Sequence, residues 1–217
     1  MITPRQYISF SQMALWEMSP EKYVNQYIYG YRQRLSRNIV YGKLVADALE
    51  EEEETGDLLL DLMLSKVPKF ARMDEVVEDG GGIEVYYEVY DKKIFVPALE
   101  NGMNDIPLLA KPDTASKNYA AFKEYKTSTR PWTQKMADDS GQISFYATAI
   151  WVKTGKIPKD IELVDIVVDY DENSALRPTG KLLRFPTQRT MVDIIKMSGR
   201  IKHAWRGIQK LCESEIL

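Results

Sequence analysis

Ten residues in the second half of the chain, Ile161 to Tyr170, restrict the possible folds most strongly. Their sequence, IELVDIVVDY, is strongly apolar and rich in β-branched side chains. A strand of this composition is typical of the buried centre of a sheet, with both of its faces covered. The sequence therefore predicts an α/β fold in which this strand lies inside a central β-sheet flanked by helices.

Helices are predicted both before and after this strand in the chain. One is expected from Trp132 to about Lys153, stopped by Gly155, and another from Thr187 to Cys212, where apolar residues recur every three or four positions. Two helices are expected over 9–34 and helical structure over 40–64. The other expected strands form an antiparallel meander and a short edge strand, at 83–90, 94–97, 106–114, 119–126 and 181–185.

The composition gives no sign of a membrane or secreted protein. No apolar run approaches the roughly 18 residues that span a bilayer, and the opening MITPRQYISFSQ does not resemble a signal peptide. One cysteine, Cys212, excludes an internal disulfide and a cysteine-cluster metal site. We expect a cytoplasmic protein of one domain, 1–217, with N-terminal helices over 1–70, a core over 80–170 and a basic helix over 187–215.

Charge is unevenly distributed along the chain. The net charge is only −3, but residues 44–105 carry 17 acidic and 5 basic side chains, whereas residues 176–210 carry 9 Lys or Arg and one acidic residue. This segregation indicates a polyanionic partner such as DNA. It is equally compatible with solvated faces, or with an interaction protein whose acidic segment binds a basic partner.

Charged residues in the middle of the chain form a candidate metal site. A strand places residues i and i+2 on one face, so Glu124 and Lys126 project together while Tyr125 turns to the core. Asp113, at the end of the preceding strand, can lie beside Glu124. Converging carboxylates repel each other, and a hard cation such as Mg²⁺ relieves this through oxygen ligands, to which the backbone carbonyl of Tyr125 could add. The spacing alone also fits a surface hairpin with a Glu–Lys pair.

Residues that follow this pair extend the site toward a nucleic acid. Gln142 and Tyr146 lie one turn apart on one helix face and can bond a phosphate or the attacking water. Side chains suited to contact a DNA backbone or to stack on a base come in two groups, Thr127, Ser128, Arg130 and Trp132 just after the lysine, and Arg189, Lys196 and Arg200 in the basic C-terminal segment.

The order Pro112-Asp113, Glu124-x-Lys126 and Gln142-x-x-x-Tyr146 resembles the PD-(D/E)XK nuclease superfamily, specifically its RecB-like exonuclease branch of phage-type and CRISPR-associated nucleases. The opening SFSQMALWEMSPEKYVNQY and GKLVADALE at 42–50 are similar to that branch's N-terminal motifs, so the resemblance covers nearly the whole chain. It implies an α/β fold with a restriction-endonuclease-like core, whose mixed central β-sheet is flanked by helices. It also implies Asp113 and Glu124 as metal ligands, and catalytic roles for Lys126, Gln142 and Tyr146. The implied activity is a Mg²⁺- or Mn²⁺-dependent exonuclease that hydrolyses single-stranded or end-processed DNA.

Two positions depart from the family pattern. The family's histidine ligand falls on Ala46, which leaves Asp47, Glu50 and Glu88 as candidates for a further ligand. The cysteines that hold an Fe–S cluster in some members are missing, so no Fe–S cluster is expected. The missing histidine keeps a second hypothesis open, a catalytically weakened DNA-binding subunit of a recombination or defence complex.

Overall fold

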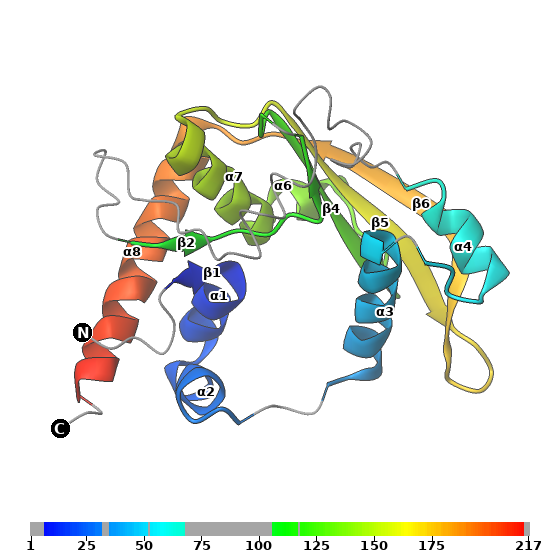
Figure 1. Ribbon diagram of the computed structural model, residues 1–217, viewed down its shortest axis with the longest axis horizontal. Helices are drawn as coiled ribbons and strands as arrows, with labels where there is room; N and C mark the ends of the chain where they lie inside the picture. The colour runs from blue at the N-terminus through cyan, green and yellow to red at the C-terminus, as the bar shows by residue number, and fades with distance from the viewer. Residues whose placement is uncertain (1–6, 32–34, 52, 68–105, 117, 215–217) are drawn as a thin grey trace.

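The computed structural model describes residues 7–31, 35–51, 53–67, 106–116 and 118–214 (Figure 1). Its central sheet has the strand order β3-β4-β5-β6. The pairs β3 (Thr114–Ala115) with β4 (Ala121–Ser128) and β5 (Asp160–Tyr170) with β6 (Leu176–Thr187) are antiparallel, whereas β4 and β5 are parallel. The predicted mixed sheet is therefore confirmed, and the strand that most restricted the fold lies inside it.

Helices cover both faces of this sheet, as predicted (Figure 1). On one face α7 (Gly141–Thr154) and α8 (Met191–Ser214) pack with β4 and β5 in the larger apolar core. On the other face α3 (Arg37–Glu51) and α4 (Leu58–Leu64) form a second, smaller core. The α/β architecture expected from the sequence is thus present.

The side chains of β5 show why its sequence is apolar at nearly every position. Ile161 and Leu163 belong to the α7–α8 core, whereas Ile166 belongs to the α3–α4 core, and all three are at most 1% exposed. Alternate residues of one strand thus fill two cores. Full burial of one such side chain stabilises the fold by about 1.5–3 kcal/mol.

Two serines cap the N-terminal helices, which lie within the predicted range 9–34. Ser9 caps α1 (Phe10–Met18) by accepting a hydrogen bond from the Gln12 N–H at 3.4 Å, and Ser19 caps α2 (Pro20–Tyr23), which continues as the π-helix η1 (Val24–Ile28). Just before α1, β1 (Ile8–Ser9) pairs in parallel with β2 (Leu108–Leu109). This pairing holds the first helices beside the segment that leads to Asp113.

Two predicted helices are each broken in two. The segment from Trp132 forms α6 (Gln134–Asp138) and α7, because the Ser140 hydroxyl accepts the Ile143 N–H at 3.4 Å and starts a new helix. Likewise α3 and α4 replace one helical stretch, because Gly56 has φ +82° and Asp57 caps α4. Short polar residues compete with the helix backbone and favour such breaks.

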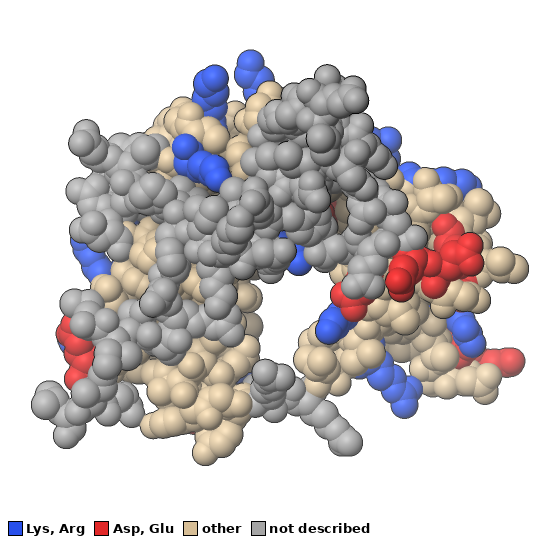
Figure 2. Space-filling model, viewed as in Figure 1, with Lys and Arg blue, Asp and Glu red and all other residues tan. Residues whose placement is uncertain are grey.

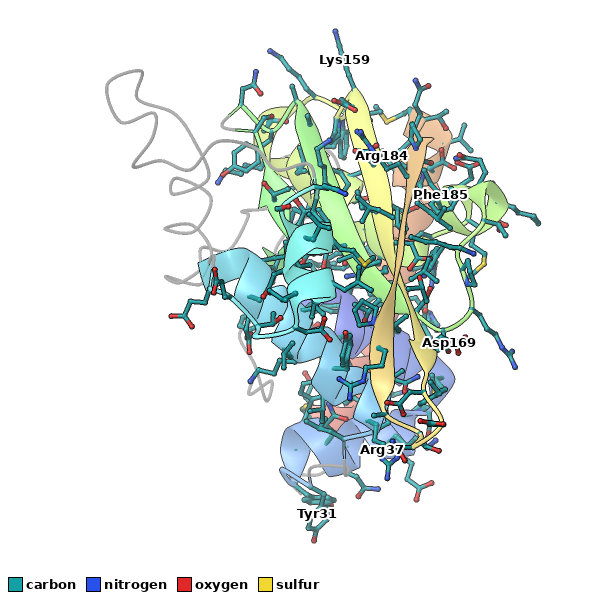
Figure 3. All side chains as sticks on the ribbon, turned by 90° about the vertical axis from the view of Figure 1, so that its right-hand side faces the viewer. Tyr31, Arg37, Lys159, Asp169, Arg184 and Phe185 are labelled. Carbon is teal, nitrogen blue, oxygen red and sulfur yellow. The ribbon has the colours of Figure 1, made fainter. Side chains whose placement is uncertain are left out.

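The predicted strand over 106–114 is wrong. Its ends belong to two different sheets, as β2 and β3, and Pro112 between them has no N–H to donate to a strand partner. The predicted edge strand is longer than 181–185, since β6 has 12 residues (Figure 3). The strands expected at 83–90 and 94–97 lie outside the described residues.

Acidic side chains gather over the α3–α4 side of the molecule (Figure 2). Asp47, Glu53 and Glu54 are exposed there. Asp61 instead accepts hydrogen bonds from the Thr55 hydroxyl at 2.7 Å and the Thr55 N–H at 2.8 Å. The described part of the acidic segment is therefore mainly a solvated surface.

Candidate active site

The candidate site is centred on β4, whose alternation separates two sets of side chains. Phe122 and Glu124 face the α7–α8 core and are at most 2% exposed, with Lys126 following on the same face. Tyr125 faces the opposite way and packs against the α3–α4 core, as predicted. The strand therefore presents a carboxylate and an ammonium group side by side at the edge of an apolar interior.

Asp113 lies beside this pair because β3 folds back on β4. The pairing of Thr114 with Lys123 brings the residue before β3 level with Glu124. The Asp113 Oδ2 atom accepts the Tyr125 backbone N–H at 2.6 Å, which fixes the carboxyl group against the strand. The Asp113 and Glu124 carboxyl groups are close enough to interact directly. The structure thus brings together the two residues that the sequence proposed as metal ligands.

Gln142 and Tyr146 join the site from the first two turns of α7. Glu124 Oε1 accepts hydrogen bonds from Lys126 Nζ at 2.5 Å and from Gln142 Nε2 at 2.7 Å. Gln142 Oε1 in turn accepts from Lys126 Nζ at 2.8 Å, and Gln142 Nε2 also donates to the Tyr146 hydroxyl at 2.8 Å. The five predicted catalytic residues, including Asp113, therefore form one connected cluster.

The ionisation of this cluster departs from that of free side chains. Burial and the neighbouring Asp113 charge raise the pKa of Glu124 to about 8, against the opposing effect of Lys126. Burial also raises the pKa of Asp113, although the Tyr125 N–H and Lys126 counteract it. Burial lowers the pKa of Lys126, but the charges of Glu124 and Asp113 outweigh burial and raise it. Without a further cation, the carboxyl pair therefore retains a proton near neutral pH.

The donor atoms at this point suit a hard divalent cation. Glu124 Oε2 is buried and has no hydrogen-bond partner in the described part of the chain, and it lies on the carboxylate that interacts with Asp113. Two carboxyl groups supply the oxygen ligands that Mg²⁺ and Mn²⁺ accept. Within the described residues no group of three or more His, Cys, Asp or Glu could hold a metal, so these two are not joined by a third.

Of the three additional ligand candidates, Asp47 is the one whose side chain the structure describes, and it does not join this pair. Asp47 and Ala46 are exposed on α3, on which Val45 and Leu49 are the buried residues. Glu88 and the side chain of Glu50 lie outside the described part of the structure.

The segment after β4 is held by a buried aspartate that no sequence motif indicates. Asp165 is 0% exposed and accepts the Ser128 hydroxyl at 2.8 Å and the Trp132 N–H at 2.9 Å. Thr127 and Trp132 are partly buried, and Trp132 packs against the larger core. Of the candidate DNA contacts in this segment, Arg130 alone is exposed.

The three basic residues proposed near the C-terminus have different environments. Lys196 is exposed on α8. Arg200 donates to both carboxylate oxygens of Glu17, at 2.9 and 2.6 Å. Arg189 is only 6% exposed, with its guanidinium bonded to protein acceptors. Its role as a DNA contact stays a prediction, and tertiary packing encloses its guanidinium here.

A pocket of about 310 Å³ opens beside the cluster. Gln142 and Tyr146 form one side of it. The N-terminal residues and the segment before Asp113 form the rest, with Tyr7, Ser9, Phe10, Ser11, Tyr27, Leu109 and Lys111. Motifs in the sequence indicate these N-terminal helices, but their position at the site depends on the β1–β2 pairing.

Comparisons with known proteins give a likeness to solved structures only. Neither the protein-family models nor the curated proteins contain a match. The chain is similar to LHK-Exo in complex with dAMP, with 12% identity, a TM-score of 0.49, and coverage of 97% of this chain and 92% of that one. It is also similar to the alkaline exonuclease LHK-Exo from Laribacter hongkongensis, with 12% identity, a TM-score of 0.45, and coverage of 96% and 91%. Separately, no described helix has the length and apolar character needed to cross a bilayer.

Proposed function

We propose that this chain is a metal-dependent deoxyribonuclease that hydrolyses phosphodiester bonds with Mg²⁺ or Mn²⁺. The observation that carries the proposal is the buried Glu124 Oε2 atom, which lacks a hydrogen-bond partner among the described residues and belongs to a carboxyl group in contact with Asp113. A buried carboxylate oxygen without a partner costs free energy unless a proton or a cation compensates it.

In this proposal Asp113 and Glu124 hold the cation, with the Tyr125 carbonyl as a further oxygen ligand. Glu50 and Glu88 stay candidates for completing the set. When bound, the cation supplies positive charge for the phosphate and makes water a better nucleophile at neutral pH. The residues of the chain orient these groups before the reaction begins.

Lys126 and Gln142 are suited to position the attacking water and the phosphate. Lys126 Nζ already contacts Glu124 Oε1 and Gln142 Oε1, so its ammonium group is fixed rather than mobile. A fixed ammonium beside the scissile phosphate stabilises the negative charge that develops there. The Tyr146 hydroxyl, held by Gln142 Nε2, offers a further polar contact on the same side.

An exonuclease mode is supported by the pocket next to Gln142 and Tyr146. Its volume of about 310 Å³ is within the range of small-molecule sites, and aromatic rings, hydroxyls and Lys111 line it. Such a lining suits the end of a DNA strand, because rings stack on bases and the lysine attracts phosphate. We propose that the end of a DNA strand enters this pocket while the adjoining phosphodiester bond lies at Glu124.

The test is a digest of end-labelled DNA, single- and double-stranded, linear and circular, with Mg²⁺ or Mn²⁺. The proposal predicts loss of linear DNA, survival of circular DNA, and no activity in Glu124→Gln. A matched control is Glu162→Gln, which alters another buried carboxylate, on the neighbouring strand, that bonds Lys123 and Arg184 instead. Equal loss of activity in both variants, or no metal dependence, would rule out the proposed site.

A second function is favoured by the small number of ligands. The described residues bring together two carboxylates but no third, and Ala46 is exposed where the resembling family has its histidine. A catalytically weakened DNA-binding subunit of a recombination or defence complex would fit this arrangement. It predicts that purified protein binds DNA but leaves every substrate uncut at high Mn²⁺, until a partner protein is added.

A further inference from the structure

We propose that Arg189 is a positioning residue, which holds the first turn of α7 so that Gln142 stays aligned with Glu124 and Lys126. The effect on catalysis rests on the proposed nuclease function, whereas the positioning itself is argued from hydrogen bonds. Arg189 lies between the end of β6 at Thr187 and the start of α8 at Met191, and its side chain is buried.

The guanidinium makes five hydrogen bonds, and all of its acceptors belong to the protein. Nε donates to the Ser144 hydroxyl at 2.7 Å. Nη1 donates to the Thr187 hydroxyl at 2.8 Å and to the carbonyl of the adjacent residue 188 at 2.7 Å. Nη2 donates to the carbonyls of Ala137 at 3.0 Å and Ser140 at 3.2 Å. An arginine has five N–H donors, so this side chain has none left for a ligand.

Three of the five acceptors flank Gln142 in the chain. Ala137 is near the end of α6, Ser140 is the N-cap of α7, and Ser144 is in its first turn. The Ser144 hydroxyl also donates to the Ser140 carbonyl at 3.1 Å, so the two anchored residues are tied to each other. Gln142 lies between these two residues in the chain, so a shift of this helical turn would stretch the hydrogen bonds that Ser140 and Ser144 accept from Arg189.

Gln142 passes this alignment to the reacting groups. Its Nε2 atom contacts Glu124 Oε1 at 2.7 Å, and its Oε1 atom contacts Lys126 Nζ at 2.8 Å. Gln142 thus links α7 to both reacting groups. A displacement of about 1 Å in such a cluster costs roughly a hundredfold in rate. The planar fork of Arg189 cannot be reproduced by lysine, which has three donors on one atom.

The test compares Arg189→Lys with Arg184→Lys. Arg184 is the matched arginine near the end of β6, and it bonds Glu162 in two places rather than any atom of α7. Arg189→Lys is expected to lower kcat roughly 10- to 100-fold with little change in KM, and to move the ¹H–¹⁵N signals of the Gln142 side-chain amide. Arg184→Lys is expected to do neither.

A stability control and a milder variant keep the outcomes separate. Met63→Ala loosens the α3–α4 core without contacting α7. The proposal is overturned if Arg189→Lys loses no more kcat than Met63→Ala and leaves the Gln142 amide signals in place. If Arg189→Lys does not fold, Ser144→Ala, which removes one anchor, must move those signals. If the wild type cuts no DNA, the nuclease proposal fails, and the amide signals alone decide whether Arg189 positions Gln142.

Discussion

Metal binding at Asp113 and Glu124 should compete with a proton, and the size of this competition follows from the structure. The pKa of Glu124 is raised to about 8, so the carboxyl pair holds a proton at neutral pH that a cation must displace. With one proton released, the affinity for Mn²⁺ should be about tenfold weaker at pH 7 and about a hundredfold weaker at pH 6 than at high pH, where it levels off above about pH 8.

Calorimetric titration of Mn²⁺ at several pH values measures this directly, and buffers of different ionisation enthalpy count the released proton. Lys126→Met should raise the pH above which the Mn²⁺ affinity becomes constant, because the lysine charge lowers the pKa of Glu124. An affinity that stays within twofold between pH 6 and pH 8, or a titration with no proton release, would refute the reasoning.

Three further outcomes are expected. Without metal, protonation of Glu124 stabilises the fold, and this contribution is complete below pH 4.5, the ordinary pKa of a glutamate. It is lost as the pH rises to about 8. Urea unfolding at several pH values would detect the loss as a fall in the free energy of unfolding. Lys126→Met should lower kcat by about 100-fold or more. Lys123→Met, on the opposite face of the same strand, should leave kcat within threefold. Equal losses of kcat in the two variants would exclude a special role for Lys126. Gly207→Ala should destabilise the protein by about 1–3 kcal/mol because the new Cβ would meet the Trp16 ring at 2.5 Å; Gly199→Ala, with open space around it, should not destabilise it, and calorimetric melting compares the two.

The most apolar strand and the last helix were predictable from sequence because burial determines their patterns. The strand at Ile161–Tyr170 fills cores on both of its faces, and the last helix fills one core from a single face. The breaks at Ser140 and Asp57 were missed because one side-chain hydrogen bond decides between a continuous and a restarted helix. Such a local choice leaves little trace in the hydrophobic pattern.

The candidate site was predictable in its residues but not in its supports. The i, i+2 rule placed Glu124 with Lys126, and the helical period placed Gln142 with Tyr146. The buried role of Arg189 was not predictable, because three of its five acceptors lie 45 to 52 residues away in the chain and only the tertiary fold brings them close. The same holds for Asp165, which reads as one acid within an apolar strand.

The most direct measurement is a crystal structure with Mn²⁺, recorded at the manganese absorption edge, of wild type and of Glu124→Gln. The nuclease interpretation predicts an anomalous peak within coordination distance of the Asp113 carboxylate and Glu124 Oε2 in the wild type, and its loss in the variant. A peak that lies elsewhere, or no peak at a Mn²⁺ concentration that supports DNA cleavage, would contradict it.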